Sequence, residues 1–171
     1  MTFFNNSKIC RRKVKDKKLC FTNLFWQKRK VKIWQRTGES YQHILMKALG
    51  YAMFVGKYPD LEIEISVNLR YKPDLIVFSE ERNYKFWGEC GANSIRKTVW
   101  ILKHTRTEKL VLFKIGMNTE SLIKQLRAEI EEKYRPKGRI SLINFVSEIV
   151  GLTASKQIEK VSKDWYSETK I

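Results

Sequence analysis

The stretch Tyr71–Lys97, YKPDLIVFSEERNYKFWGECGANSIRK, decides the fold of this 171-residue chain. Two short runs rich in aromatic and β-branched residues, 75–78 and 84–87, lie on either side of a polar segment. This pattern predicts a β-hairpin. If its turn lies at Glu81-Arg82, the two strands that follow from it pair antiparallel over their whole apolar length.

Asp74 and Glu89 then stand opposite each other on neighbouring strands. Directly opposed residues have Cβ atoms roughly 5 Å apart. Two carboxylates at that distance repel each other, and a shared cation relieves the repulsion. A second interpretation stays open, because Pro73 ahead of an apolar run is typical of a strand start and acids at strand ends are usually solvated. A slip of one residue would also separate the pair.

Composition indicates one folded domain in a reducing compartment. Hydrophobic residues make up 43% of the chain and five Trp are spread along it, which excludes a disordered protein. The three cysteines, Cys10, Cys20 and Cys90, show no CxxC spacing, so we expect no structural zinc site and a cytoplasmic location. We expect no membrane association, because no apolar run reaches the length of a membrane span and the N-terminus is charged too early for a secretory signal.

The net charge of +16 is concentrated near the N-terminus. Residues 8–36 contain twelve Lys or Arg and one acid, Asp16. We expect residues 1–18 to be a mobile basic arm, followed by two strands at 19–25 and 31–34. Interleaved cations and aromatic residues are typical of a nucleic-acid groove, and equally of a strand ribbon with one buried face. The alternative explanation for the high net charge is that it only keeps the protein soluble.

Nucleic acid, DNA or RNA, is therefore the expected partner, and we leave a homodimer open. The candidate nucleic-acid-binding residues are the cations Arg11, Arg12, Lys13, Lys28, Arg29, Lys30, Lys32 and Arg96.

The remaining periodicity predicts alternating helices and strands. Thr37 is expected to cap a helix that ends near Gly56, with Glu39 in its first turn. Further expected elements are a strand at 61–69, a helix at 95–104, a strand at 109–115, a helix at 118–133, a strand at 139–146 and an amphipathic helix from Ser155. We divide the chain into the arm 1–18, a domain 19–150 and a C-terminal amphipathic tail 151–171.

From Glu39 on, the order helix, strand, strand, strand, helix, strand resembles the PD-(D/E)xK nuclease superfamily. The motif is Pro73-Asp74, fourteen residues, then Glu89-Cys90-Gly91. The segment Trp87–Phe113, WGECGANSIRKTVWILKHTRTEKLVLF, is similar to the YaeQ branch. The resemblance implies an α/β protein with a restriction-endonuclease-like αβββαβ core, a mixed central sheet flanked by helices, and additional N-terminal strands.

The resemblance also implies a site. Asp74 and Glu89 would bind Mg²⁺ or Mn²⁺, and Glu39 would be the auxiliary acid. The chain departs from the pattern at Gly91, where the superfamily has a lysine.

Some branches move that lysine to the following helix, where Lys97, beside Arg96, is the candidate. Its ammonium should then lie within roughly 6 Å of a carboxylate of Asp74 or Glu89. The alternative is a solvated helix face. Lys72 is a weaker candidate, because its side chain should point away from that of Pro73.

The expected function is a Mg²⁺-dependent nuclease or nuclease-like protein that hydrolyses phosphodiester bonds. Two carboxylates, a hard metal and a nearby lysine supply the nucleophilic water and the charge stabilisation that this reaction needs. The first alternative is a catalytically inactive protein of the same fold that binds nucleic acid. The second is a module whose basic arm binds an acidic protein or ribosomal RNA.

Overall fold

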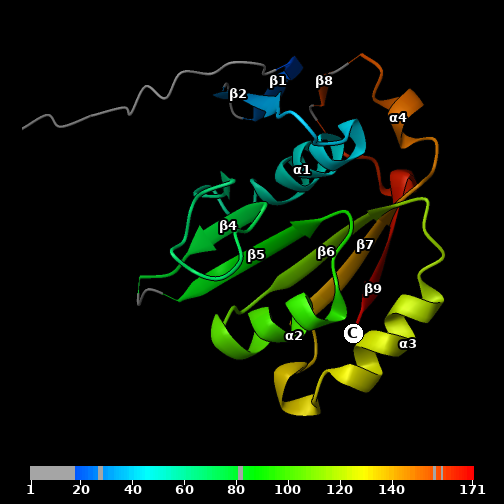
Figure 1. The fold of residues 1–171 in the computed structure, drawn as a ribbon. Coiled ribbons are helices and arrows are strands. Elements are labelled where there is room, and N and C mark those ends of the chain that lie inside the picture. The colour runs from blue at the N-terminus through cyan, green and yellow to red at the C-terminus, as the bar shows by residue number, and fades with distance from the viewer. Residues whose placement is uncertain (1–17, 27–28, 81–82, 156, 159) are drawn as a thin grey trace, which may run out of the picture.

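A mixed six-stranded sheet forms the centre of the protein, with strand order β3-β4-β5-β6-β7-β9 (Figure 1). The structure is a computed structural model that describes residues 18–26, 29–80, 83–155, 157–158 and 160–171. Strands β5, β6 and β7 run parallel, and the outer pairings are antiparallel. The strands are β3 (Glu62–Ile63), β4 (Leu75–Phe78), β5 (Tyr84–Cys90), β6 (Leu110–Ile115), β7 (Ile140–Phe145) and β9 (Tyr166–Lys170).

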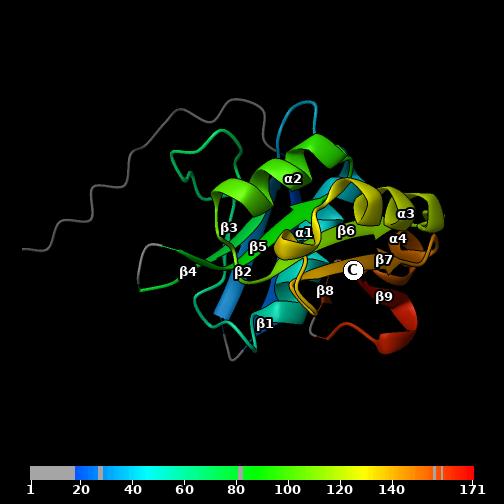
Figure 2. The same cartoon turned by 90° about the horizontal axis from the view of Figure 1, so that it is seen from below.

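Helices cover both faces of this sheet, as the sequence predicted. Helix α1 (Tyr41–Phe54) lies on one face, and α2 (Ile95–His104) and α3 (Glu120–Glu129) lie on the other (Figures 1 and 2). The remaining helices are short: η1 (Glu132–Tyr134), α4 (Ile149–Leu152) and η2 (Lys163–Trp165). No helix in the described ranges has the length and apolar character needed to cross a membrane.

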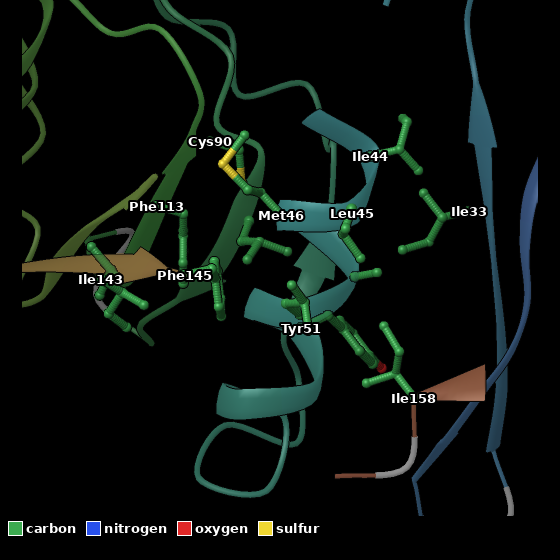
Figure 3. Close-up of a cluster of buried hydrophobic side chains, with 14 of the residues drawn as sticks. Ile33, Ile44, Leu45, Met46, Tyr51, Cys90, Phe113, Ile143, Phe145 and Ile158 are labelled. Carbon is green, nitrogen blue, oxygen red and sulfur yellow. The ribbon is translucent and has the colours of Figure 1, made fainter. Parts of the chain in front are cut away.

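A second, three-stranded sheet covers the outer side of α1. Its order is β2-β1-β8, with β1 (Lys18–Trp26) antiparallel to β2 (Arg29–Gln35) and parallel to β8 (Gln157–Ile158). Ile33 and Ile158 from this sheet pack into the same core as α1 and the central sheet (Figure 3). Helix α1 is therefore enclosed between two sheets, and residues 44–51 are buried without interruption.

The predicted hairpin register is confirmed over three pairs, Leu75 with Gly88, Ile76 with Trp87 and Val77 with Phe86. The register shifts only beyond Val77, toward the tip. The expected turn at Glu81-Arg82 lies outside the described residues. The two strands predicted near the N-terminus and the helix predicted at 95–104 are also confirmed.

Three sequence predictions are wrong. Helix α1 begins at Tyr41, capped by Ser40 rather than Thr37, so that Glu39 precedes the helix. The strand expected at 61–69 ends at Ile63, because Glu64 has a positive φ of 55°. The amphipathic helix expected from Ser155 is absent, and within the described residues this segment contributes β9, which pairs antiparallel with β7 at the sheet edge. The expected mobile arm falls almost wholly on residues 1–17, outside the described residues.

Candidate functional site

A cavity of about 720 Å³ opens beside the start of α1, where β4 begins and β5 ends. Charged and small residues form its wall: Arg36, Thr37, Gly38, Glu39, Ser40, Gln42, His43, Met46, Lys47, Glu64, Lys72, Pro73, Asp74, Cys90, Gly91 and Ala92. Three of these residues are carboxylates and three are lysine or arginine, so the cavity is a charged site rather than an apolar ligand pocket.

Lys47 lies at the centre of this charge cluster. Its side chain is only 1% exposed, because α1 is enclosed between two sheets. The ammonium donates to the carboxylates of Glu39 and Glu64, and lies 3.9 Å from Asp74 Oδ1. Burial alone would lower the pKa of Lys47, but the hydrogen bonds to Glu39 and Glu64 outweigh it and raise this pKa above its ordinary value. Lys47 is therefore a buried, charged ammonium at neutral pH.

Asp74 ties three elements together at the hairpin end. Its Oδ2 accepts from the backbone N–H of Cys90 at 2.8 Å, and its Oδ1 lies 3.1 Å from His43 Nε2. Since an ionised carboxylate only accepts hydrogen bonds, His43 must donate from Nε2. Burial opposes the charge of Asp74, but the hydrogen bond from His43 and the nearby charges lower its pKa. The backbone carbonyl of Asp74 also accepts from the N–H of Glu64 at 3.0 Å.

Glu39 and Glu64 reach Lys47 from two irregular segments. The carboxylate of Glu39 accepts from the backbone N–H of Arg36 at 3.2 Å and lies 3.4 Å from His43 Nε2. Glu64 contacts the guanidinium of Arg36 as well as Lys47. Burial would raise the pKa of Glu64, but the hydrogen bond from Lys47 lowers it overall. Lys72, the weaker candidate for the missing lysine, has its ammonium 3.6 Å from Glu64 Oε2, and both Lys72 and Pro73 line the cavity.

Glu89 has partners of its own on the opposite side of the sheet. One carboxylate oxygen accepts from Trp87 Nε1 at 2.7 Å, and the other accepts from the ammonium of Lys97. Burial raises the pKa of Glu89, which is 3% exposed, although Lys97 opposes that rise. The expected closeness of Lys97 to an acid is therefore present. Neither Glu89 nor Lys97 lines the cavity that contains Asp74.

The backbone explains why Gly91 departs from the motif. Its φ of 76° lies in the left-handed region, which side chains other than glycine rarely adopt. A Cβ atom there would lie 3.2 Å from His43 Nδ1. The carbonyl of Gly91 accepts from the ammonium of Lys114 on β6, whose pKa is lowered by burial. A lysine at position 91 would strain this backbone and crowd His43.

The candidate nucleic-acid-binding residues do not gather at the cavity. Arg11, Arg12, Lys13 and Lys28 lie outside the described residues. Arg29, Lys30 and Lys32 lie in β2. Arg96 is exposed on α2 and lines a separate hollow between α2 and α3.

The carboxylates fit Mg²⁺ in kind but do not form a closed cage. In the described part of the chain, no group of three or more His, Cys, Asp or Glu side chains is arranged to hold a metal ion. Mg²⁺ needs no such cage, since it usually keeps several waters and binds through one or two carboxylates. Asp74 and Glu39 line the cavity and suit that role, whereas Glu89 does not line it.

The same arrangement of sheets and helices occurs in known structures. The YaeQ protein from Xanthomonas axonopodis pv. citri superposes with a TM-score of 0.58 at 13% identity, over 83% of this chain and 84% of that one. The YaeQ protein from Pseudomonas syringae gives 0.57 at 16% identity, over 89% and 85%. The chain has a YaeQ-like fold. No protein-family model and no curated protein matches the sequence.

Within this YaeQ-like fold, sequence reasoning missed Lys47 and Glu64. Lys47 stands alone as a charged residue in the apolar run of α1, four positions after His43. A lone lysine at a buried helical position needs acidic partners, and that signal could have found it. Glu64 was hidden because it occupies a polar position in what reads as an alternating strand.

Proposed function

We propose that this protein is a metal-dependent nuclease of the PD-(D/E)xK type, which hydrolyses phosphodiester bonds of nucleic acid at the cavity around Asp74. One observation carries the proposal: the buried, charged Lys47 lies among Glu39, Glu64 and Asp74 on the wall of an open cavity. Carboxylates for a hard metal, with a fixed cation beside them, are the groups that this reaction requires. The YaeQ-like fold is the scaffold, and the proposal rests on the residues of the site itself.

Each residue has a role that follows from its contacts. Asp74 and Glu39 would hold Mg²⁺ or Mn²⁺, which supplies Lewis acidity and lowers the pKa of bound water. His43 donates to Asp74 and fixes the orientation of that carboxylate. Lys47 provides the positive charge that the motif lacks at Gly91, in a site where its low exposure strengthens electrostatic interactions. The sequence predicted Asp74 and Glu89 as the metal ligands. We now propose Glu39 instead of Glu89 as the second ligand, and Lys97 as the ion-pair partner of Glu89.

Arg36 and Lys72 suit the binding of the substrate phosphate. Both line the cavity, with side chains 55% and 40% exposed, and both lie beside Glu64. Cations at the mouth of a cavity attract a polyanion and orient a phosphate near the carboxylates.

A second candidate function is the binding of nucleic acid without hydrolysis. The observation in its favour is that the acids at the end of the hairpin are already paired: Asp74 with His43, Glu39 and Glu64 with Lys47, and Glu89 with Lys97. A metal ion must compete with these cations. A role in binding an acidic protein or ribosomal RNA through residues 8–36 stays an expectation from the charge distribution.

Cleavage of labelled single-stranded and duplex DNA and RNA, in Mg²⁺, Mn²⁺ or EDTA, tests the proposal. We expect cleavage only with metal, and its loss in Asp74→Asn, which keeps the side-chain shape. Glu62→Gln is the matched control, because Glu62 is exposed on β3 and lies outside the cavity wall. Calorimetric titration of Mn²⁺ should show weaker binding to Asp74→Asn than to Glu62→Gln. Binding of nucleic acid without cleavage by the wild type would instead favour the second candidate function.

A further inference from the structure

We propose that the exposed face of α2, together with the basic hollow at its C-terminal end, is a track that binds single-stranded nucleic acid. This inference rests on the proposed function only in taking nucleic acid as the ligand. The track lies on the α2–α3 face of the sheet, and α1 lies on the other face (Figures 1 and 2). It is separate from the cavity around Asp74.

The first part of the track is a hollow of about 660 Å³ between α2 and α3. Four side chains from one face of α2 line it: Arg96, Trp100, Lys103 and His104. Residues three, four or seven positions apart in a helix lie on the same face. The rings of Trp100 and His104 stack, with centroids 4.6 Å apart and an interplanar angle of 12°. His104 Nδ1 is 2.8 Å from the carbonyl of Trp100, which holds the exposed imidazole in place.

The second part is a hollow of about 680 Å³ beyond the end of α2. Lys103 lines both hollows, so the two lie side by side. Five cations line the second one: Lys103, Arg106, Lys133, Lys137 and Arg139. Arg139 holds the local backbone, since it donates to the carbonyls of Leu102, Thr107 and Tyr134.

Acidic residues only partly neutralise this surface. Glu108 lines the second hollow and Glu129 lines the first. Glu131 pairs with both Lys103 and Lys133, which lower its pKa to about 2. Among the side chains that the structure describes, those of Arg106 and Lys137 have no hydrogen-bond or ion-pair partner, and both are exposed. The two are thus available for phosphate groups.

Single-stranded nucleic acid fits this combination better than other polyanions. Single strands are bound by a cationic groove with aromatic rings on which bases stack, whereas base faces inside a duplex are covered. An acidic protein would use the cations but not the stacked ring pair. The track and the candidate site are close along the chain: Gly91 and Ala92 line the Asp74 cavity, and α2 begins at Ile95. From there, ten helical residues extend about 15 Å to the basic hollow.

Fluorescence anisotropy with single-stranded and duplex oligonucleotides of equal length tests the track in the full-length chain. Arg106→Glu combined with Lys137→Glu should weaken single-strand binding at least tenfold. It should also flatten the log–log salt slope by about 1.4, since each phosphate contact on a single strand contributes about 0.7. The control is Lys124→Glu with Lys163→Glu, which makes the same change in net charge at exposed positions outside both hollows and should bind like the wild type.

His104→Ala separates stacking from charge. It should weaken single-strand binding about fivefold or more while leaving the salt slope unchanged, because a stacked base releases no counterions.

Equal binding by the wild type and the Arg106→Glu/Lys137→Glu variant, with cleavage intact, would overturn the track and leave the proposed function standing. Tighter binding of duplex than of single strand, or equal competition by an oligoglutamate of the same charge, would overturn the choice of ligand. A wild type that binds no nucleic acid would overturn both the track and the proposed function.

Discussion

Replacing Lys47 with methionine tests the charge cluster directly. The substitution keeps an unbranched side chain that suits the buried run of α1 and removes only the ammonium. Glu39, Glu64 and Asp74, which are 13%, 20% and 16% exposed, then lose their shared cation. Removing one partner of a buried ion pair costs about 3–5 kcal/mol, because the remaining charge is left uncompensated. Partial exposure of the acids lets water relieve some of that cost, so we expect a loss of about 3 kcal/mol at pH 7.

The loss should depend on pH in a defined direction. The folded-state pKa values of Asp74 and Glu64 are lowered, so these acids contribute stability above their ordinary values of 3.8 and 4.5 and lose it as pH falls. Without Lys47, Glu64 loses the hydrogen bond that most lowers its pKa, and Asp74 loses one of several nearby charges. Both pKa values then rise from those in the wild type, and protonation relieves the variant as pH falls. The stability gap between the wild type and Lys47→Met should therefore be full at pH 7 and narrow between about pH 5 and pH 3.

Urea unfolding followed by circular dichroism at pH 7, 5 and 3.5 measures this gap. Lys57→Met is the control, because Lys57 is exposed beyond the end of α1 and should change stability by no more than about 0.5 kcal/mol. Adding Glu64→Gln to Lys47→Met should recover part of the loss, since one uncompensated charge is removed. Equal stability of Lys47→Met and the wild type at pH 7, or a gap that widens in acid, would refute the account of the cluster.

Three further predictions concern neighbouring positions. Gly91→Lys should lower the free energy of unfolding by about 1–2 kcal/mol, because φ at this position is 76°, and should not increase cleavage; urea unfolding and the nuclease assay check both. Lys97→Met should destabilise the protein more than Glu89→Gln does. Lys97→Met leaves the charge of the buried Glu89 unpaired, whereas in Glu89→Gln the side chain of Lys97, which is 23% exposed, can turn to solvent. The loss in Lys97→Met should be larger at pH 8 than at pH 5, because burial raises the pKa of Glu89 and protonation at lower pH removes the unpaired charge. Gly50→Ala should cost about 1–3 kcal/mol in thermal or urea unfolding, since its Cβ would lie 2.7 Å from Leu75 Cδ1.

The hairpin could be predicted because its pattern is local. Two short apolar runs flank a polar segment, and the position of the turn in that segment sets the pairing of the strands. The clear apolar–polar alternation at 61–69 misled. Leu61 and Ile63 pack against the α1 core, but Ile65 and Val67 pack against the core on the other face. The positive φ of Glu64 ends the strand between these two pairs, and no periodicity in the sequence reports such a change of face.

The polar strand β9 was equally hidden. Its sequence, YSETK, has little apolar character, because it lies at an edge of the sheet where β7 is its one neighbour. Such a strand is fixed by long-range pairing rather than by its own pattern, and the amphipathic spacing of the preceding residues favoured a helix.

The residues of the candidate site also differ in whether the sequence could predict them. The predicted register brings Asp74 and Glu89 to the same end of the hairpin, but which way their side chains turn depends on α1 and α2, which approach from opposite faces. Lys47 was hidden because its burial results from the second sheet on the outer side of α1. A pattern of charges along the chain therefore pointed to Asp74 and Glu39 but missed Glu64 and Lys47, the cation that these acids share.

Because the backbone at Gly91 disfavours a lysine at that position, the positive charge of the site comes from another element. Three lysines from three elements reach the end of β5: Lys97 donates to Glu89, Lys114 to the carbonyl of Gly91, and Lys47 to Glu39 and Glu64. Lys47 is the one of these three whose side chain lines the cavity of Asp74. Its pKa is raised, so at neutral pH it holds its proton and acts as a fixed positive charge rather than as a base. If this site hydrolyses phosphodiesters, Lys47 stabilises negative charge on the phosphate, and a different group must accept the proton of the attacking water.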